Sequence, residues 1–367
     1  MKKVALVTFH RPLSIGAQLQ AFALQEAIQT IDCDCRVIDY EPAFPSKSRI
    51  LSPSRRIYST ITGLVFARKI KSQSNRFTAW ASTHLHQTEP ITTLSQLKQV
   101  AEDFDTFVCG SDQIWRIPNR GYYFLDFTPD SARRIAYAPS FGNINFDNAS
   151  KELIKEYLSR FDSISVREND GAKFVSELLG YDVPSVLDPT LLWSADYWRN
   201  YAVDPGGSLP KRFVLLFSIQ DTMPCFRAAK KISVRLGIPL VVVDTARRLI
   251  WHPFLNNYFD VGPAEFLRLV DLADFVVTSS FHGTAFAINF GKPFLTICRK
   301  ESENVNSRIT TLADKLNTSD RLISPDDEIP EPVFNDLDPG INIRLDEERF
   351  CCRNILTKFL FLTDPNK

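Results

Sequence analysis

Four segments of the sequence place polar side chains and glycine directly after a short apolar run. Segment 278–284 is the most distinctive, because His282 stands there between Ser280 and Gly283. A histidine at the junction of a strand and a helix can direct its imidazole into a cleft, near the positive end of the helix. We therefore select His282 as a candidate functional residue, with Ser279 and Ser280 as ligand-binding neighbours. A structural histidine whose hydrogen bonds are satisfied is the alternative.

The second segment contains Arg167, which follows the apolar residues of a buried strand. The planar guanidinium of arginine can hold a carboxylate or a phosphate through two parallel hydrogen bonds. Arg167 is therefore a candidate anion-binding residue. A surface salt bridge to Glu168 or Asp170 is the alternative.

The third segment runs Gly110-Ser111-Asp112-Gln113 and is followed by Trp115. Such a polar group after a strand suits the recognition of a sugar by hydrogen bonds, and a tryptophan can stack on its ring. The alternative is a helix N-cap, in which Ser111 or Asp112 only starts a helix. Four polar or glycine positions exceed what a cap requires, which favours a binding role.

The fourth segment runs from Ser14 to Gln20, with Gly16 at the turn before a helix. Gly16 permits close approach of the backbone, and the helix N-terminus offers free N–H groups to an anion or a sugar hydroxyl. Gly16 and Gln20 are therefore candidate binding residues. A simple tight turn is the alternative.

Several other kinds of site find no support. The GxGxxG fingerprint of dinucleotide binding and the GxSxG elbow of hydrolases are absent. The seven cysteines contain no CxxC pair, and no histidine stands at zinc-ligand spacing from them. We expect reduced cysteines, no metal site and no bound cofactor.

The elements that must position these segments alternate between strand and helix. Short apolar runs predict strands at 4–9, 35–40, 106–109, 134–138, 163–166, 213–219, 240–244, 275–279 and 294–298. Helical spacing predicts helices at 17–28, 151–161, 171–179, 226–236, 264–272 and 284–290. This alternation predicts two α/β halves with parallel sheets, and a ligand cleft at the carboxyl ends of their strands.

The 367 residues exceed the size of one ordinary core, so we expect two domains. Residues 204–210 combine Pro, Gly and Asp without periodicity and predict a linker. The expected domains are 1–203, which carries Arg167 and an insertion at 42–88, and 211–345, which carries His282. Residues 346–367 are expected to form a C-terminal helix and tail.

The formal net charge is zero, so no overall field draws the protein to nucleic acid or membrane. No apolar run reaches the roughly 20 residues that a spanning helix needs, and the N-terminus does not read as a signal peptide, so we expect a cytoplasmic protein.

One segment of the chain is unusually basic. Between Pro42 and Thr88 there are eight Lys or Arg and no Asp or Glu. This segment is interpreted as a solvated, mobile helical insertion or, alternatively, as a surface for an anionic acceptor or for phospholipid headgroups at the membrane.

Several blocks of the sequence resemble, in order, the polysaccharide pyruvyl transferase family. They are VCGSDQIW, YYFLDF, RRIAYAPSFG, SISVRE, LDPTLL and TSSFHGTAFAINFGKPF. The opening VTFHRPLSIGAQLQAFALQEAI is similar to the N-terminal strand, glycine turn and helix of that family. The resemblance extends to about Arg308.

The resemblance implies a glycosyltransferase-B-like fold, with two Rossmann-like domains and the active site between them. It also implies the transfer of pyruvate from phosphoenolpyruvate to a hexose of a surface or exopolysaccharide repeat unit, carried as a sugar or lipid-linked oligosaccharide, to form a cyclic ketal. His282 is similar to the acid–base residue of the family, and Arg167 to its phosphoenolpyruvate-binding arginine. A histidine and an arginine are the residue types that ketal formation requires, because the reaction needs a proton donor for the enol carbon and a cation for the departing phosphate.

The sequence departs from the family pattern in two places. The turn reads Ser14-Ile15-Gly16 where an Asn-Tyr-Gly type is common, and Ser280 stands where some branches carry an arginine. We expect Arg308 to substitute for that arginine. Two other interpretations remain open: a nucleotide-sugar glycosyltransferase of the same fold, and a non-catalytic glycan-binding relative.

Overall fold

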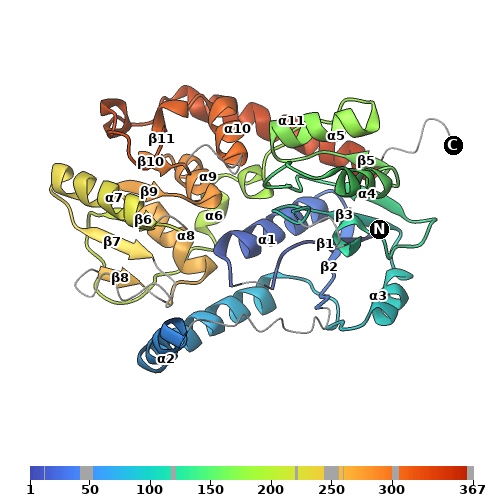
Figure 1. Ribbon diagram of the computed structural model, residues 1–367, viewed down its shortest axis with the longest axis horizontal. Helices are drawn as coiled ribbons and strands as arrows, with labels where there is room; N and C mark the ends of the chain where they lie inside the picture. Colours follow the sequence, from blue (N-terminus) through green and yellow to red (C-terminus); the bar gives the residue numbers. More distant parts are fainter. Residues whose placement is uncertain are drawn as a thin grey trace.

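The structure is a computed structural model, and it describes residues 1–11, 13–41, 53–116, 121–219, 222–243, 256–258, 260–299 and 306–361. Within these ranges the strands form two separate parallel sheets, one of five strands and one of six. Helices pack around each sheet, so the chain has the two predicted Rossmann-like domains (Figure 1).

The N-terminal sheet has the order β2-β1-β3-β4-β5. β1 pairs with both of its neighbours in parallel register, with Val4 opposite Cys35 and Thr106. β3 is buried throughout because helices cover both faces of the sheet, which explains its continuous apolar run. The strands and helices of this domain are β1 (Lys2–Val7), α1 (Ile15–Gln29), β2 (Cys33–Val37), α3 (Leu94–Ala101), β3 (Thr106–Cys109), β4 (Arg133–Ala136), α4 (Asn148–Leu158), β5 (Ser163–Ile164) and α5 (Asn169–Leu179).

The C-terminal sheet has the order β11-β10-β9-β6-β7-β8. β6, β7, β9 and β10 are buried along their whole length. A short 3-10 helix, η2 (Pro189–Leu192), and α6 (Ala195–Arg199) lead into this domain. Its strands and helices are β6 (Val214–Phe217), α7 (Thr222–Leu236), β7 (Leu240–Val243), β8 (Asn256–Tyr258), α8 (Pro263–Leu272), β9 (Phe275–Thr278), α9 (Phe281–Asn289), β10 (Phe294–Ile297), α10 (Ser307–Leu316) and β11 (Leu322–Ile323).

The predicted strands are all present, with ends that differ by a few residues. The prediction missed β8 and β11, which have three and two residues and so show little pattern. It also missed the amphipathic helices α3 and α10. The helix predicted at 284–290 begins at Phe281, because Ser280 already has the extended backbone of an N-cap residue.

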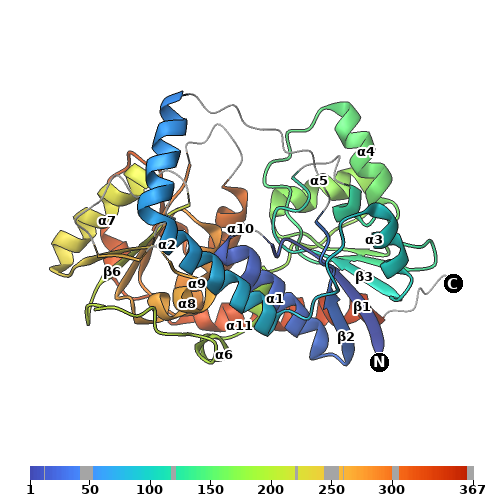
Figure 2. The same cartoon turned by 90° about the horizontal axis from the view of Figure 1, so that it is seen from below.

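Helix α2 (Pro53–His84) forms most of the basic segment, and residues 42–52 lie outside the described ranges. The helix runs across both domains (Figure 2), and apolar side chains of its described part, from residue 67 onwards, belong to the core. This corrects the interpretation as a solvated insertion for that part of the segment. Phe77 and Trp80 are buried in the core. Towards the C-terminal domain, Ser72 donates a hydrogen bond to Asp260 at 2.8 Å, and Arg76 Nη1 lies 3.2 Å from a Glu265 oxygen.

Helix α11 (Gly340–Phe361) begins six residues before the predicted boundary at 346 and returns to the N-terminal domain. The Leu187 N–H donates to Cys352 Sγ at 3.2 Å, and Lys2 Nζ donates to the Leu360 carbonyl at 2.6 Å. α11 lies on the opposite side of the molecule from α2 (Figure 1). No helix in the described ranges has both the length and the apolar character needed to cross a membrane.

Loops at the carboxyl ends of β1 and β2 are joined by a charged cluster. Asp39 follows β2, and it accepts hydrogen bonds from His10 Nε2 at 2.8 Å and from Arg11 Nη2 at 2.8 Å. Burial raises the pKa of Asp39, but the hydrogen bonds from His10 and Arg11 outweigh it and lower the pKa to about 2. Asp39 is thus ionised at neutral pH and holds the loop after β1 in place.

This cluster predicts a pH-dependent contribution to stability. The folded pKa lies below the unfolded value, so the contribution is present above about pH 4 and is lost as the pH falls towards 2. When fully present, the contribution of ionised Asp39 to the free energy of unfolding is about 2 kcal/mol. In urea unfolding, the free energy of the wild type should therefore fall more steeply between pH 5 and pH 3 than that of Asp39→Asn. Parallel pH dependences in the two proteins would contradict this assignment.

Candidate active site

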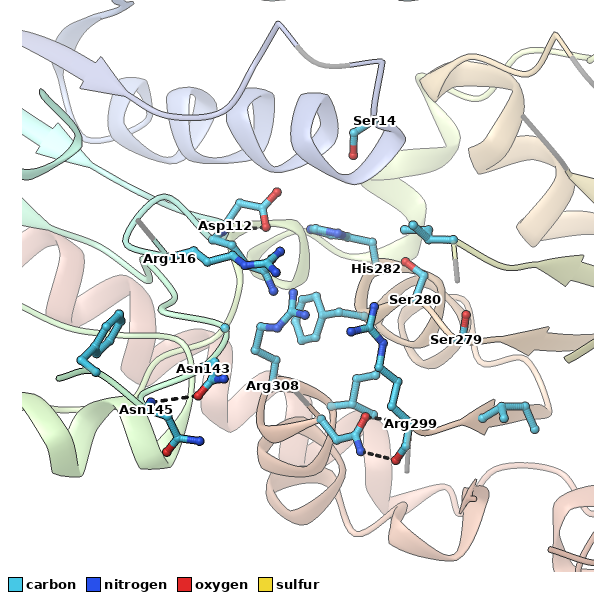
Figure 3. A pocket seen from close by; sticks show the side chains of 18 residues that line it. Ser14, Asp112, Arg116, Asn143, Asn145, Ser279, Ser280, His282, Arg299 and Arg308 are labelled. Carbon is cyan, nitrogen blue, oxygen red and sulfur yellow. Dashed lines mark hydrogen bonds between the residues drawn. The ribbon is translucent and has the colours of Figure 1, made fainter. Parts of the chain in front are cut away.

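The main cavity has a volume of about 620 Å³ and is lined by residues from both domains (Figure 3). Asp112 and Gln113, which follow β3, and the loop at 142–146 come from the N-terminal domain. The opposite wall comes from residues 279–282, which follow β9, together with Arg299 and Arg308. The cavity thus lies at the carboxyl ends of both sheets, where the sequence predicts the cleft.

His282 is the second residue of α9 and lies at the cavity, with only 7% of its surface exposed. Its Nε2 is 3.6 Å from Asp188 Oδ2 and has no hydrogen-bond partner among the described residues. That distance is too long for a good hydrogen bond but close enough for a strong charge interaction. Because Nε2 is buried beside Asp188, Nδ1 is the ring nitrogen left to act on a ligand.

Gly16 lies directly against the His282 ring. A Cβ atom at Gly16 would be 2.0 Å from Nδ1, 2.4 Å from Cγ and 2.6 Å from Cε1 of His282. These three distances place it on the face of the imidazole, where no side chain can fit. The first turn of α1 therefore fixes the ring from the N-terminal domain. Gly16 is the second residue of α1 rather than part of the turn predicted before the helix, and the contact with His282 explains why a glycine stands there.

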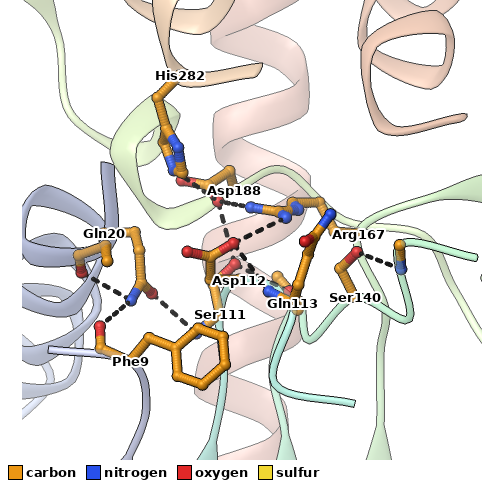
Figure 4. Close-up of polar contacts among 12 residues, drawn as sticks. Phe9, Gln20, Ser111, Asp112, Gln113, Ser140, Arg167, Asp188 and His282 are labelled. Carbon is orange, nitrogen blue, oxygen red and sulfur yellow. Dashed lines mark hydrogen bonds and ion pairs between the residues drawn. The ribbon is translucent and has the colours of Figure 1, made fainter. Parts of the chain in front are cut away.

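Asp188 is the carboxylate behind His282, and it is completely buried at the start of η2 (Figure 4). Its Oδ2 accepts hydrogen bonds from Arg167 Nη1 at 2.6 Å and from Ser111 Oγ at 3.0 Å. Its Oδ1 accepts from the N–H and hydroxyl of Thr190. Burial raises its pKa, but the charges of His282 and Arg167 and the hydrogen bonds outweigh burial and hold the pKa well below the usual range. Asp188 is therefore ionised at neutral pH.

Arg167 lies behind the cavity lining, and its side chain is 1% exposed. Nη1 bonds to Asp188, Nη2 is 3.4 Å from Asp112 Oδ1, and the guanidinium carbon lies 4.5 Å from the centre of the Phe281 ring. Burial lowers its pKa, but these carboxylates outweigh that effect and raise it. Neither surface partner considered from the sequence, Glu168 or Asp170, pairs with it. Direct contact between Arg167 and a ligand would require the side chain to move.

Arg308, unlike Arg167, lines the cavity, so its guanidinium is a cation that a ligand in the cavity can reach. Burial and the charge of Arg167 lower its pKa to about 10, and no carboxylate in the described ranges forms an ion pair with it. The side-chain amide of Gln113 lies 2.6 Å from Arg308 Nη2, which requires the amide oxygen to face the arginine. Arg116 and Arg299 also line the cavity. This part of the cavity is therefore suited to an anion.

Ser280 is buried at the N-cap of α9, and its hydroxyl has no hydrogen-bond partner in the part of the chain that the structure describes. An unpaired buried hydroxyl at a cavity wall, beside the free N–H groups of a helix N-terminus, is suited to an anionic ligand. Ser279 also lines the cavity, and its hydroxyl lies 3.0 Å from that of Ser218. Both residues are thus at the wall that the sequence indicated.

Four of the predicted binding residues do not line the cavity: Gly16, which packs on the His282 ring, and Gln20, Gly110 and Ser111, which lie behind the wall. Gln20 and Ser111 are completely buried, and the Ser111 N–H donates to the Gln20 side-chain oxygen at 2.9 Å. A Cβ at Gly110 would lie 1.9 Å from the Tyr137 carbonyl oxygen, and its φ of +130° also favours glycine. These residues hold the loop that carries Asp112 and Gln113, and they do not line the cavity. Their binding role stays a prediction.

The sequence analysis missed several residues of the site. Asp188 was seen only as part of a motif, because nothing in its local sequence shows that it faces an arginine 21 positions earlier. Arg116, Arg299 and the loop at 142–146 gave no signal, since none of them repeats or forms a known spacing. Within the described ranges, no three His, Cys, Asp or Glu side chains are grouped so that they could hold a metal ion. The absence of a metal requirement stays a prediction.

Comparisons with solved structures agree with the fold. An S. aureus protein, MnaA solved with UDP, is 14% identical, with a TM-score of 0.52 over 96% of this chain and 90% of its own. A Listeria monocytogenes protein assigned as a UDP-N-acetylglucosamine 2-epimerase is 12% identical, with a TM-score of 0.51 over 99% and 98%. At these identities the likeness concerns the fold alone, which is glycosyltransferase-B-like.

A comparison with curated protein sequences finds no match. The sequence model of one family, described as polysaccharide pyruvyl transferase, does match residues 15–298. That range runs from the first residue of α1 to the end of β10, and it includes Gly16, Arg167, Asp188 and His282. The chain therefore belongs to the polysaccharide pyruvyl transferase family.

Proposed function

We propose that the protein transfers pyruvate from phosphoenolpyruvate to a hexose of a surface or exopolysaccharide repeat unit, forms a cyclic ketal and releases phosphate. Family membership supports pyruvyl transfer in general. The observation that carries the finer proposal is the pairing of His282 and ionised Asp188 beside a cavity lined by Arg308, which has no carboxylate partner in the described ranges. This arrangement can supply a proton and hold an anion in one place.

The donor carries a carboxylate and a phosphate, and both need cations. Arg308 has no carboxylate partner in the described ranges, and burial lowers its pKa, an effect that an anionic ligand beside it would offset. The Ser280 hydroxyl and the N-terminus of α9 add neutral donors at the same wall. Arg308 therefore substitutes for the arginine that Ser280 replaces. Arg167 fixes Asp188 and Asp112 from behind.

The chemistry begins with protonation of the methylene carbon of phosphoenolpyruvate by His282. The resulting cation at C2 is attacked by one acceptor hydroxyl, which loses its proton. The bond from C2 to the phosphate oxygen then breaks, and phosphate leaves with the electron pair. The second hydroxyl adds to C2 and also loses a proton. Ionised Asp188 stabilises positive charge on the His282 ring, which a general acid carries before it gives up its proton.

A nucleotide-sugar glycosyltransferase remains the alternative activity, since the fold hosts both chemistries. One neighbour was solved with UDP, at 14% identity. Incubation of the pure protein with phosphoenolpyruvate and candidate acceptors distinguishes the activities through phosphate release. Consumption of a nucleotide sugar, without consumption of phosphoenolpyruvate, would favour the alternative. Binding of acceptor without turnover would indicate a non-catalytic relative.

We also propose a cytoplasmic location, with the basic segment at an anionic membrane face. Arg68 and Lys71 are exposed on α2, as this requires. Arg76 is not available for it, because it pairs with Glu265 and Asp260. Each of the remaining basic residues would contribute about 1 kcal/mol of binding free energy near an anionic membrane surface.

His282→Ala should lower turnover by about 100-fold or more, the scale for loss of a general acid, and leave the fold intact. Turnover is followed by phosphate release and the fold by thermal unfolding. His86→Ala is the matched control, because His86 is exposed and lies outside the cavity lining. Activity of His282→Ala within about threefold of wild type would make His282 a structural residue.

Arg308→Met should raise the KM for phosphoenolpyruvate by about 10- to 100-fold, the loss expected for hydrogen bonds to a charged group. The KM for the acceptor should change little, because the lost cation contacts the donor. Arg36→Met removes an exposed arginine of β2 and serves as the control. A KM for phosphoenolpyruvate that stays within twofold would exclude Arg308 from donor binding.

Chelators should leave activity unchanged, because the positive charge that the donor needs comes from arginine side chains. The test compares phosphate release before and after dialysis against EDTA. Loss of activity that magnesium or manganese restores would overturn this proposal and favour the glycosyltransferase alternative.

A further inference from the structure

Asp112 has two carboxylate oxygens in different surroundings. Its Oδ1 accepts a hydrogen bond from the Gln113 N–H at 2.8 Å and lies 3.4 Å from Arg167 Nη2. Its Oδ2 has no hydrogen-bond partner in the described ranges, although the residue lines the cavity. One oxygen thus anchors the side chain, and the other is left for a ligand.

The backbone holds Asp112 in an unusual conformation. Its φ is +69°, in the left-handed region that few residues other than glycine adopt. Two hydrogen bonds to its carbonyl oxygen, from the Ile114 and Ser140 N–H groups, fix this conformation at 2.8 Å each. Non-glycine residues in this region persist where the surroundings over-determine them, and they are frequent at active sites.

Asp112 is also tied to the proposed acid. Arg167 bonds to Asp188 through Nη1 and contacts Asp112 through Nη2, and Asp188 lies beside His282. One buried guanidinium therefore sets the positions of both Asp112 and the His282 partner. Figure 3 shows the His282 ring extending from α9 towards the side of the cavity where Asp112 lies. A proton donor and a free carboxylate oxygen thus lie at the same cavity.

We propose that the N-terminal wall of the cavity is the acceptor subsite, and that Asp112 Oδ2 is the base that removes the proton of the attacking hydroxyl. The proposal rests on the function proposed above. As the acceptor oxygen bonds to C2 of the protonated donor, its proton passes to Asp112. After the first addition the C2–O bond to phosphate breaks, and the departing phosphate takes the proton from Asp112, which returns to a carboxylate. The second hydroxyl then adds to C2 and passes its proton to Asp112, from which it is returned to His282 and replaces the proton given to the donor carbon.

The rest of this wall is suited to a sugar ring. Phe146 lines the cavity, and its ring is supported from behind by Phe141 at 5.9 Å and Phe174 at 5.8 Å between centroids. The Asn145 N–H donates to Asn143 Oδ1 at 2.8 Å, which shapes the loop and leaves the amide of Asn145 for a ligand (Figure 3). An aromatic face with nearby amides recognises a sugar ring by stacking and hydrogen bonds. The cavity volume of about 620 Å³ lies in the range of small-molecule sites and leaves room for both substrates.

The first experiment replaces the base and measures phosphate release from phosphoenolpyruvate with methyl glucoside, galactoside and mannoside as acceptors. Asp112→Asn keeps an oxygen for Gln113 and Arg167, so kcat should fall by about 100-fold or more while the KM for phosphoenolpyruvate stays within about threefold. Asp112→Gly fits the left-handed backbone, and added formate should restore part of its rate. Rescue by a small base would not follow from a structural role.

Asp32→Asn is the matched control, because Asp32 is an exposed aspartate with a φ of +60° outside the cavity lining. Phe146→Ala should raise the acceptor KM by about 3- to 10-fold and leave the KM for phosphoenolpyruvate unchanged. Phe350→Ala, on the exposed face of α11, should change neither.

The outcomes separate the two proposals. If wild type releases no phosphate with any acceptor, the proposed function fails and this inference fails with it. If wild type is active but Asp112→Asn stays within threefold of its kcat, or formate does not rescue Asp112→Gly, only the role of Asp112 as base is overturned. An acceptor KM that Phe146→Ala leaves unchanged overturns the placement of the acceptor on this wall.

Discussion

The ion pair between Arg167 and Asp188 is the interaction on which the rest of the site depends. Both side chains are almost completely removed from water, and a buried pair of this kind is sustained only when further hydrogen bonds satisfy its remaining atoms. Ser111 and Thr190 provide these bonds to the oxygens of Asp188, from the loop after β3 and from η2. On the arginine side, Nη2 lies 3.4 Å from Asp112, while Nε has no hydrogen-bond partner in the described ranges. Loss of one partner would leave an uncompensated charge, at a cost of about 3–5 kcal/mol. The geometry around His282 is therefore set by a part of the core that can hardly rearrange.

Sequence reasoning predicted the parts of the site that depend on local order. Gly16, Asp112, Ser280 and His282 all follow strands or precede helices, so their approach to one cleft follows from the rule for parallel sheets. The burial of Arg167 did not follow from that rule. A guanidinium after a strand looks the same in sequence whether a ligand or a carboxylate faces it, and Asp188 lies on a turn with no periodic pattern. Pairs that are distant in sequence, such as Gly16 and His282, become visible only when the fold is known.

The distribution of charge explains how a protein with no net charge can attract an anionic substrate. The formal charge is zero over the whole chain, yet Arg116, Arg299 and Arg308 line one cavity with Asp112 as its only carboxylate among the described lining residues. A local field of this kind acts over a few ångströms and is strengthened by the low dielectric of a half-buried site. In the proposed function, Arg299 and Arg308 on the C-terminal wall serve the donor, while Asp112, the amides and the aromatic ring on the N-terminal wall serve the acceptor.

Helices α2 and α11 each contact both domains, and this affects how the domains can move relative to each other. α2 is fastened to the C-terminal domain through Asp260 and Glu265 and to the core through Trp80, while α11 is fastened to the N-terminal domain through Cys352 and Leu360. These two struts lie on opposite sides of the molecule (Figure 1). A clamshell rotation of the two domains would therefore have to change contacts on both sides of the molecule at once.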